Sequence, residues 1–321
     1  RSMIQFRMLN KSKGPAMWSP RAQCDRQLFS SEWRKVLERT NNLFIWQENA
    51  VKLIIDNNQV KGIETIFGTR FMSKSVILTN GTFLNGIIHI GFKKISGGRA
   101  GDQSSVGISD QMREMGIEVE RLKTGTSSRV DGRTIDFDKM TEQKGDFDVR
   151  KFSYISDAEY VKDQKSCYIT YTNNDVHDEL RRGMKFSPLF TGRIQGKGPR
   201  YCPSIEDKVK RFSERERHQL FLEPQTAKCT EYYINGMSSS LPIEIQKKMI
   251  ASVKGLENAR VIRYGYAIEY DYVDPTELKH TLETKKIKNL YHAGQINATT
   301  GYEEAAAQGL MASINASLAI D

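Results

Sequence analysis

Residues 289–315 read Asn289-Leu-Tyr-His-Ala-Gly-Gln-Ile-Asn-Ala-Thr-Thr-Gly-Tyr-Glu-Glu-Ala-Ala-Ala-Gln-Gly-Leu-Met-Ala-Ser-Ile-Asn315. The short apolar run at 290–293 predicts a buried strand, and Gly294 ends that run. From Tyr302 onward the small residues and their spacing predict a helix. The stretch is therefore expected to form a strand, a Gly-containing turn and a helix N-terminus.

The start of this helix has its own signals. Thr299 or Thr300 is expected to cap it, and Glu303 and Glu304 suit its first turn. A helix N-terminus directs unpaired backbone N–H groups and a partial positive charge at whatever lies over the turn. An ordinary strand-to-helix connection has the same pattern, so this stretch by itself leaves a ligand site and a packing role equally open.

Composition places the chain among globular proteins. It has 321 residues, of which 38% are hydrophobic and 27% charged. No apolar run approaches the ~20 residues that span a bilayer, and the first residues lack a signal-peptide core. The four cysteines, Cys24, Cys167, Cys202 and Cys229, form no C-x-x-C pair, which fits free thiols in a reducing cytoplasm.

The net charge of +9 is concentrated in one block. Residues 181–217 contain eleven Lys and Arg against four acids, a net charge of +7. A concentrated basic surface is typical of proteins that bind nucleic acid. The alternating signs after Lys208 also fit a solvated helix face. From the block we predict RNA contacts by Arg181, Arg182, Lys185, Arg193, Lys210 and Arg211.

The first half of the chain mixes a helix and a meander. Ser19 and Pro20 predict a helix start, and a stripe of apolar residues continues to Leu37. Three short strand patterns follow between residues 51 and 71, separated by turn residues. A strand that ends in a Gly turn begins at Ser75. This order is typical of two-domain flavoproteins in which a meander interrupts the nucleotide-binding sheet.

A domain crossing is expected near residues 121–129. A Gly-rich loop occupies residues 91–107 before it, and long polar stretches with isolated strand patterns follow it. A strand pattern at 260–271 leads back. We predict one domain from residues 1–128 and 272–321, with a second domain, 129–271, inserted between them.

Cys202 is the strongest candidate for chemistry. It follows a Gly/Pro turn, and Pro203 can occupy the first position of a helix, which would lower the pKa of the thiol. Arg200 and Lys208 would add to that effect. A thiolate beside a basic surface can attack C6 of uracil, which makes C5 nucleophilic. A small, half-buried cysteine without a reaction is the alternative.

Glu206 and Asp207 follow at the start of the same expected helix. They are candidate acid and base groups, and equally suit the first turn as helix charges. His292 is expected to be a core residue, with a cofactor-facing position as the alternative. No metal-binding cluster is recognisable.

Several long motifs resemble the MnmG family, also called GidA, over essentially the whole chain. They are Gly97-Gly-Arg-Ala-Gly-Asp102, Arg121-Leu-Lys-Thr-Gly125, Gly198-Pro-Arg-Tyr-Cys-Pro-Ser-Ile-Glu-Asp-Lys-Val209, Gly265-Tyr-Ala-Ile-Glu-Tyr-Asp271 and Thr300-Gly-Tyr-Glu-Glu-Ala-Ala-Ala-Gln-Gly309. The resemblance implies an α/β fold, with a Rossmann-like FAD-binding domain of the glutathione-reductase type and an inserted NADH and substrate domain.

The resemblance also implies an activity. Members of this family bind FAD and NADH and work with the GTPase MnmE. They modify C5 of the wobble uridine of certain tRNAs, using a methylene group from methylenetetrahydrofolate and an amine from glycine or ammonium. A cytoplasmic homodimer is the family expectation.

By family similarity, individual residues acquire roles. Ala50, Ser105 and Gln295 match FAD contacts, and Gly294 and Gly301 belong to the same turn. Cys202 matches a cysteine implicated in catalysis, as nucleophile or proton donor. The NADH stretch runs from residue 198 to 212 and contributes Gly198, Pro199, Arg200, Tyr201, Lys208 and Phe212.

The chain departs from the family at its ends. No G-x-G-x-x-G precedes residue 20, and the helical C-terminal domain of the family would begin after Asp321. The chain is therefore expected to be an internal portion that binds FAD weakly or not at all by itself. Two alternatives stay open: a folate- and FAD-dependent tRNA uridine methyltransferase, which the stretch 198–208 disfavours, and a non-catalytic tRNA-binding protein.

Overall fold

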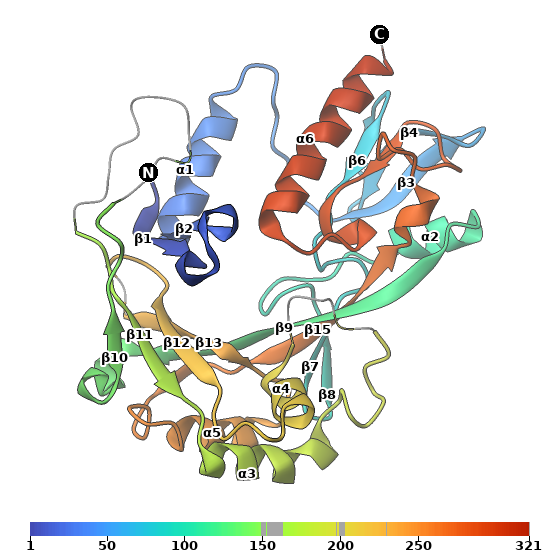
Figure 1. Cartoon of the computed structure of the whole chain (residues 1–321). Coiled ribbons are helices and arrows are strands. Elements are labelled where there is room, and N and C mark those ends of the chain that lie inside the picture. The colour runs from blue at the N-terminus through green and yellow to red at the C-terminus, as the bar shows by residue number, and fades with distance from the viewer. Residues whose placement is uncertain (149–151, 153–162, 197, 199–202, 229, 321) are drawn as a thin grey trace.

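The computed structural model describes residues 1–148, 152, 163–196, 198, 203–228 and 230–320. Its largest sheet crosses the molecule, with the strand order β10-β11-β12-β13-β9-β15-β7-β8 and with β14 also paired to β9 (Figure 1). All its pairings are antiparallel. The strands are β7 Ile87–Ile90, β8 Lys93–Ser96, β9 Val119–Asp131, β10 Thr141–Gln143, β11 Cys167–Tyr171, β12 Gln219–Pro224, β13 Glu231–Ser238, β14 Val261–Arg263 and β15 Tyr266–Val273.

Two long neighbours, β9 and β15, connect the two ends of the molecule (Figure 1). Their register runs without interruption from Val119 opposite Val273 to Thr126 opposite Tyr266. Every residue of β15 is buried. The two predicted domain boundaries, at 128/129 and 271/272, fall inside these strands, so the chain passes between the two predicted regions as paired extended backbone.

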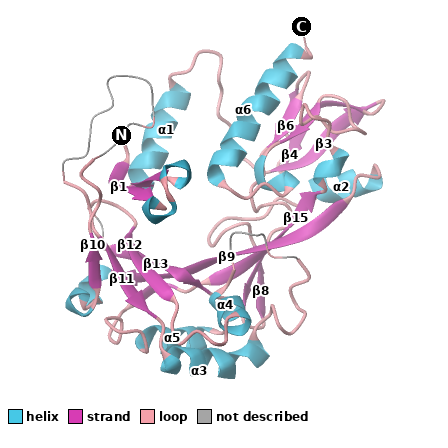
Figure 2. Ribbon diagram, viewed as in Figure 1, coloured by secondary structure: helices cyan, strands magenta, loops and turns pink. Residues whose placement is uncertain are grey.

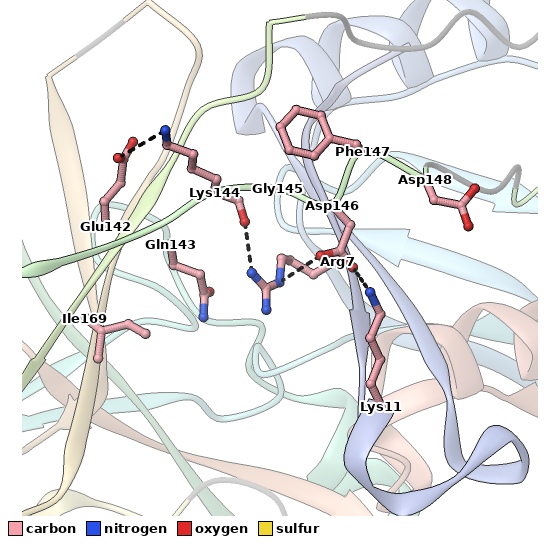
Figure 3. Close-up of a pocket in the computed structure, with 10 residues that line it drawn as sticks. All are labelled: Arg7, Lys11, Glu142, Gln143, Lys144, Gly145, Asp146, Phe147, Asp148 and Ile169. Carbon is pink, nitrogen blue, oxygen red and sulfur yellow. Dashed lines mark hydrogen bonds and ion pairs between the residues drawn. The ribbon is translucent and has the colours of Figure 1, made fainter.

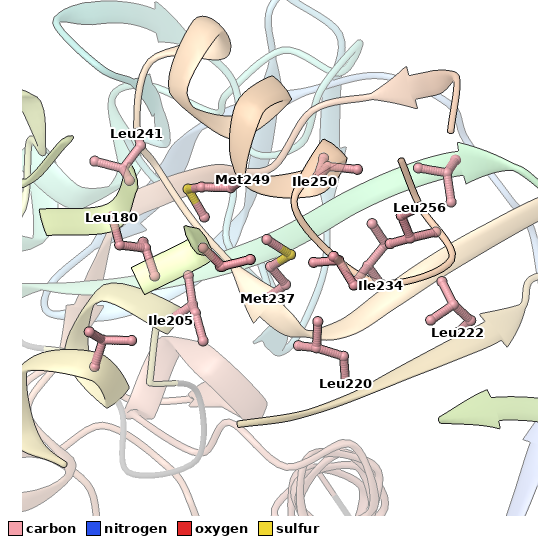
Figure 4. Close-up of a cluster of buried hydrophobic side chains, with 14 of the residues drawn as sticks. Leu180, Ile205, Leu220, Leu222, Ile234, Met237, Leu241, Met249, Ile250 and Leu256 are labelled. Carbon is pink, nitrogen blue, oxygen red and sulfur yellow. The ribbon is translucent and has the colours of Figure 1, made fainter. Parts of the chain in front are cut away.

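One face of this sheet is covered by helices α3 Asn174–Gly183 and α5 Ile243–Ala251, with α4 Ile205–Arg211 beside them (Figure 2). Leu180, Ile205 and Ile250 point from these helices into a cluster with Leu220 and Ile234 of the strands (Figure 4). Burying each such side chain contributes roughly 1.5–3 kcal/mol. This apolar layer fixes α4 on the sheet.

The second region contains the predicted meander, which the structure confirms as β3 Ala50–Asp56, β4 Gln59–Thr65 and β5 Arg70–Met72. Asn57 and Asn58 both have positive φ, as a tight two-residue hairpin turn requires. The remaining elements are the parallel pair β6 Val76–Leu78 and β16 Leu290–His292, and helices α2 Ile108–Glu114 and α6 Tyr302–Leu318. A separate core lies among them, with Leu53, Ile108, Leu290 and Ile296 at its centre.

The predicted helix start at Ser19 is wrong. Residues Ser19–Cys24 form strand β2, which pairs with β1 Met3–Leu9, and α1 begins later and spans Arg26–Glu38. The cap is Asp25, whose carboxylate accepts hydrogen bonds from the N–H groups of residues 27 and 28. Pairing with a strand upstream, which the local pattern could not show, overrides the Ser-Pro signal.

The strand predicted at 260–271 is divided into β14 and β15 around Gly265. The Gly265 N–H donates to Ser128 Oγ at 3.0 Å and to Gln246 Oε1 at 2.8 Å. Short 3-10 helices at Lys11–Lys13, Pro15–Met17, Gly132–Thr134, Phe137–Lys139, Met184–Phe186, Pro275–Glu277 and Gly294–Asn297 complete the described connections. Within the described ranges, no helix is both long and apolar enough to cross a bilayer.

Candidate functional site

The strand, turn and helix predicted at 289–315 are confirmed as β16, the 3-10 turn Gly294–Asn297 and α6. Gly294 has φ +86°, a conformation that glycine adopts without strain. Its N–H donates to Gln308 Oε1 at 2.9 Å, and Gln308 Nε2 donates to Thr299 Oγ1 at 2.9 Å. Helix α6 therefore holds the turn at 294–299 through the side chain of Gln308.

The predicted capping of α6 by Thr299 or Thr300 is wrong. The N-cap is Gly301, and no side-chain cap is present. Gly301 has no side chain to cap the N–H groups of the first turn, and the Glu304 carboxylate lies against Gly301, where a Cβ would collide with it. Close by, Gln295 Oε1 is buried and has no hydrogen-bond partner among the described residues. An uncapped helix start beside an unsatisfied buried acceptor fits a polar ligand that carries both acceptors and a donor.

Ala50 and Ser105 are brought into direct contact. Ser105 Oγ donates to the carbonyl oxygen of Ala50 at 2.5 Å, and Ser105 is 8% exposed. Ala50 packs against the same apolar cluster that contains Ile296 of the 3-10 turn. The predicted FAD contacts thus come from three segments grouped around one core, so these residues fit the walls of a cofactor site.

A pocket of about 900 Å³ opens beside the turn. It is lined by Pro275, Thr276, Leu278, Lys279, His280, Leu282, Lys285, Asn297, Ala298, Thr299 and Gln308. Asn297 is 3% exposed, and its Oδ1 has no partner among the described residues. His292, which precedes the turn, is fully buried as expected of a core histidine, and burial lowers its pKa to about 3.

The second group of predicted residues surrounds α4. The helix begins at Ile205 with Ser204 as its cap, so the prediction of Pro203 at the first helical position is wrong. Ser204 and Asp207 form a reciprocal capping box, in which Ser204 Oγ accepts from the Asp207 N–H at 3.2 Å. Four residues predicted for this site, Pro199, Arg200, Tyr201 and Cys202, lie outside the described residues.

Glu206 points into the protein. It is 0% exposed, and its Oε1 accepts from Ser239 Oγ at 2.8 Å and from the Ser240 N–H at 3.2 Å. Burial raises the pKa of this carboxyl above its usual range. Lys208 Nζ donates to the Gly236 carbonyl at 3.2 Å, and burial lowers its pKa. Both side chains therefore hold α4 against β13.

The surfaces next to α4 are more open. Gly198 is exposed, and a Cβ added there would have no heavy atom within 4 Å. Phe212 ends α4 with 43% of its surface exposed. Lys123 of β9 is 3% exposed and places its Nζ 3.9 Å from the Asp207 carboxylate. The predicted NADH stretch therefore combines exposed backbone with a cation beneath its helix.

The predicted RNA-contact residues divide into two kinds. Arg181 and Arg182 are paired with Asp178 and Glu179 of the same helix at 2.7 and 2.8 Å. The others lie over or beside aromatic rings: Lys185 over Phe186 at 5.1 Å, Arg193 over Phe92 at 4.4 Å and Lys210 over Phe190 at 4.5 Å, with Arg211 exposed next to them. Exposed cations interleaved with aromatic rings suit a nucleic-acid backbone and its bases.

A buried ion network was missed by sequence reasoning. Glu269 and Asp271 of β15, His89 of β7 and Arg121 of β9 meet between the strands. Arg121 NH1 lies 2.7 Å from Asp271 Oδ1, and Arg113 NH2 of α2 lies 2.9 Å from Asp271 Oδ2. The sequence signal for this network was the pair Glu269 and Asp271 at alternate positions of a strand pattern. When such a strand is buried, each carboxylate needs a compensating partner.

A further pocket of about 680 Å³ lies between β1 and β10 (Figure 3). Its cations are paired within it: Arg7 donates to the Lys144 carbonyl at 2.9 Å, and Lys11 lies 2.9 Å from Asp146. None of the predicted site residues lines it. Among the described residues, no group of three or more His, Cys, Asp or Glu side chains is arranged to hold a metal ion.

A meander beside a parallel strand pair, a strand–turn–helix unit and a large antiparallel sheet with its own helical layer define an α/β protein of the flavoprotein type. The chain belongs to the GidA family, since the family model described as "Glucose inhibited division protein A" matches residues 1–321.

Individual relatives agree. A protein of Flavobacterium johnsoniae named "tRNA uridine 5-carboxymethylaminomethyl modification enzyme MnmG" is 59% identical over 320 residues, which cover 100% of this chain and 51% of the relative. A protein of the same name from Aliarcobacter butzleri is 60% identical, with 99% and 51% covered. The solved structure of Aquifex aeolicus GidA has a TM-score of 0.93 and 50% identity, covering 99% of this chain and 54% of that one. The chain thus spans about half the length of these relatives.

Proposed function

We propose that this chain is the catalytic part of an FAD- and NADH-dependent enzyme that adds a (carboxymethyl)aminomethyl group at C5 of the wobble uridine, position 34, of tRNA. The observation that carries the proposal is the uncapped start of α6 beside Gln295, within a chain that matches the GidA family along its whole length. Methylenetetrahydrofolate is the proposed carbon donor, and the GTPase MnmE is the proposed partner. A cytoplasmic homodimer is part of the same proposal.

The residues of the α6 turn would hold the flavin. Backbone N–H groups at the start of α6 can donate to flavin or phosphate oxygens, and Gln295 Oε1 can accept from a flavin N–H or a ribityl hydroxyl. Ala50 and Ser105 would close the site from the meander side. A bound FAD would supply two-electron transfer between NADH and the carbon fragment.

Cys202 is the proposed reactive group at the uracil ring. Its thiolate would bond to C6, and the electron pair of the C5–C6 double bond would move toward C5 and the C4 carbonyl oxygen. C5 would then bond to the methylene carbon of methylenetetrahydrofolate while one C–N bond of that methylene breaks and its electron pair goes to the nitrogen. Loss of the C5 proton with departure of the thiolate would restore the double bond. Gly198, Lys208 and Phe212 belong to the stretch proposed for NADH, while Glu206 and Asp207 support the helix beneath it.

The basic and aromatic surface supports tRNA as the substrate. Lys185, Arg193 and Lys210 offer cations to phosphates, and the rings of Phe92 and Phe186 can stack with bases. This surface also favours a second candidate, a non-catalytic tRNA-binding role. The two candidates differ in redox activity, because only the enzyme oxidises NADH.

The test uses the intact protein with its partner. Wild type is expected to show a flavin absorbance spectrum, to oxidise NADH and to yield aminomethylated uridine on nucleoside analysis of tRNA. Cys202→Ser should abolish the modified nucleoside while the flavin spectrum is unchanged. A methylated uridine as product would instead favour the methyltransferase alternative, and tRNA binding without NADH oxidation would favour the binding role. A normal level of modified uridine with Cys202→Ser would show that this thiol is not required for the reaction.

A further inference from the structure

One buried carboxylate holds the backbone that leads into the predicted NADH stretch. Glu269 Oε1 accepts hydrogen bonds from the N–H groups of Gln195 and Gly196, each at 2.9 Å. Glu269 lies on β15 and is 5% exposed. The two amides belong to a connection without regular secondary structure, so this carboxylate supplies the hydrogen bonds that a strand partner would otherwise supply.

The second carboxylate oxygen is held by the neighbouring strands. Glu269 Oε2 lies 3.3 Å from His89 Nε2 of β7 and 3.6 Å from Arg121 NH2 of β9. Burial alone would raise the pKa of this carboxyl, but the adjacent His89 imidazole, the hydrogen bonds from the two amides and the charge of Arg121 lower it to about 2. The side chain is therefore an ionised acceptor whose position is set by three strands.

Gly196 brings the same connection onto the sheet. A Cβ added at Gly196 would lie 2.8 Å from the carbonyl carbon of Leu122 and 3.1 Å from the Lys123 nitrogen. Only a glycine allows the backbone to approach β9 this closely. On the far side of the stretch, the capping box of Ser204 and the buried Glu206 fix the start of α4.

We infer that Glu269 is a positioning residue for the predicted NADH stretch, acting through the N–H groups of Gln195 and Gly196. It acts through described backbone before Gly198, while Ser204 and Glu206 hold the backbone at the start of α4. This inference rests on the proposed function, in which residues 198–212 contact NADH. A displacement of about 1 Å at a reacting centre can cost roughly 10²-fold in rate, so such an anchor has a measurable effect.

The experiment compares two substitutions in the intact, FAD-loaded protein. Glu269→Ala removes both acceptors and is expected to raise the KM for NADH or lower kcat of NADH oxidation, so that kcat/KM falls about 10- to 100-fold. Glu269→Gln retains a carbonyl oxygen for the two amides, and its NH2 group can donate to His89, so kcat/KM should stay within about threefold of wild type. Glu223→Ala is the matched control, because Glu223 is a buried carboxylate, 9% exposed, that contacts Arg21 and Asn235. Its kcat/KM should be unchanged.

A second variant keeps the inference testable if Glu269→Ala does not fold. Gly196→Ala pushes the backbone off β9 without changing Glu269, and it should lower kcat/KM for NADH in the same way. Unchanged kinetics in both variants would overturn the inference, as would equal damage from Glu269→Gln and Glu269→Ala. A failure of the proposed function is distinguishable, since then wild type itself would oxidise no NADH and form no modified uridine.

Discussion

At the scale of single residues, Glu206 illustrates what burial does to a candidate catalytic acid. Its side chain is fully enclosed, and Oε2 has no partner among the described residues, while Oε1 accepts from Ser239 and Ser240. Burial raises its pKa, because removal from water disfavours the charged form. A carboxyl in this state is better suited to hold α4 than to exchange protons with a substrate.

The raised pKa of Glu206 gives a pH dependence with a defined sign. Below the unfolded-state pKa of about 4.3 both states are protonated and the group costs nothing. As the pH rises above that value, the unfolded state loses its proton first and wild type loses stability. Glu206→Gln cannot ionise and should therefore become more stable relative to wild type as the pH rises from about 4.3 toward the raised folded-state pKa, measured as the urea midpoint.

The exposed Glu244 on α5 serves as the control for this measurement. The midpoint of Glu244→Gln measures what a Glu-to-Gln substitution does at an exposed position of the same protein. A Glu206→Gln midpoint that falls relative to wild type as the pH rises would show that the carboxylate is ionised in the folded protein.

At the scale of elements, the basic surface around α4 separates paired from available cations. Arg181 and Arg182 already face carboxylates one helical turn away, whereas Arg193 and Lys210 lie over aromatic rings. A phosphate contact contributes less binding free energy at a guanidinium that is already paired, because the carboxylate partner must first be displaced. The eleven positive charges counted from the sequence therefore do not contribute equally.

This difference predicts unequal effects on tRNA binding by the intact protein. Arg193→Ala and Lys210→Ala should each weaken binding and reduce the slope of log K against log salt by about 0.7–0.9, the loss of one phosphate contact. Arg181→Ala, the matched control, should have a smaller effect on both quantities. Filter binding at four or five salt concentrations measures them, and an equal loss from Arg181→Ala would contradict the division.

At the scale of the whole molecule, Asp271 joins elements of both regions. It is 1% exposed on β15 and accepts from Asn85 Nδ2 at 2.8 Å, from Arg113 of α2 and from Arg121 of β9. The network lies near the start of β9 and the end of β15, beside α2. It therefore fixes the orientation of α2 relative to the long strands.

Removing this carboxylate should be costly. Asp271→Ala leaves two guanidinium groups without their buried partner and is expected to lower the free energy of unfolding by about 3 kcal/mol. Asp110→Ala removes the other partner of Arg113, an exposed ion pair, and should cost less than about 0.5 kcal/mol. Urea unfolding of the intact protein measures both, and equal costs would contradict the structural role of Asp271.

The local pattern of residues 289–315 was sufficient to predict β16, the turn and α6, because a strand, a glycine and a helix each have local chemical signals. The same is true of the meander and its Asn-Asn turn. The family motifs also pointed to Ala50, Ser105 and Gln295, although nothing local shows that Ser105 reaches the Ala50 carbonyl.

The tertiary structure decided what depends on partners distant in sequence. Ser19–Cys24 forms a strand because its backbone pairs with Met3–Leu9. Thr299 does not cap α6, because its hydroxyl accepts a hydrogen bond from Gln308. Glu269 holds the backbone at Gln195 because folding brings Gln195, His89 and Arg121 next to its carboxylate. The sequence by itself determined the meander, the strand–turn–helix unit at 289–315 and the family. Only folding determined the partners of the buried charges, because a charge removed from water requires compensating groups that long-range packing alone can bring to it.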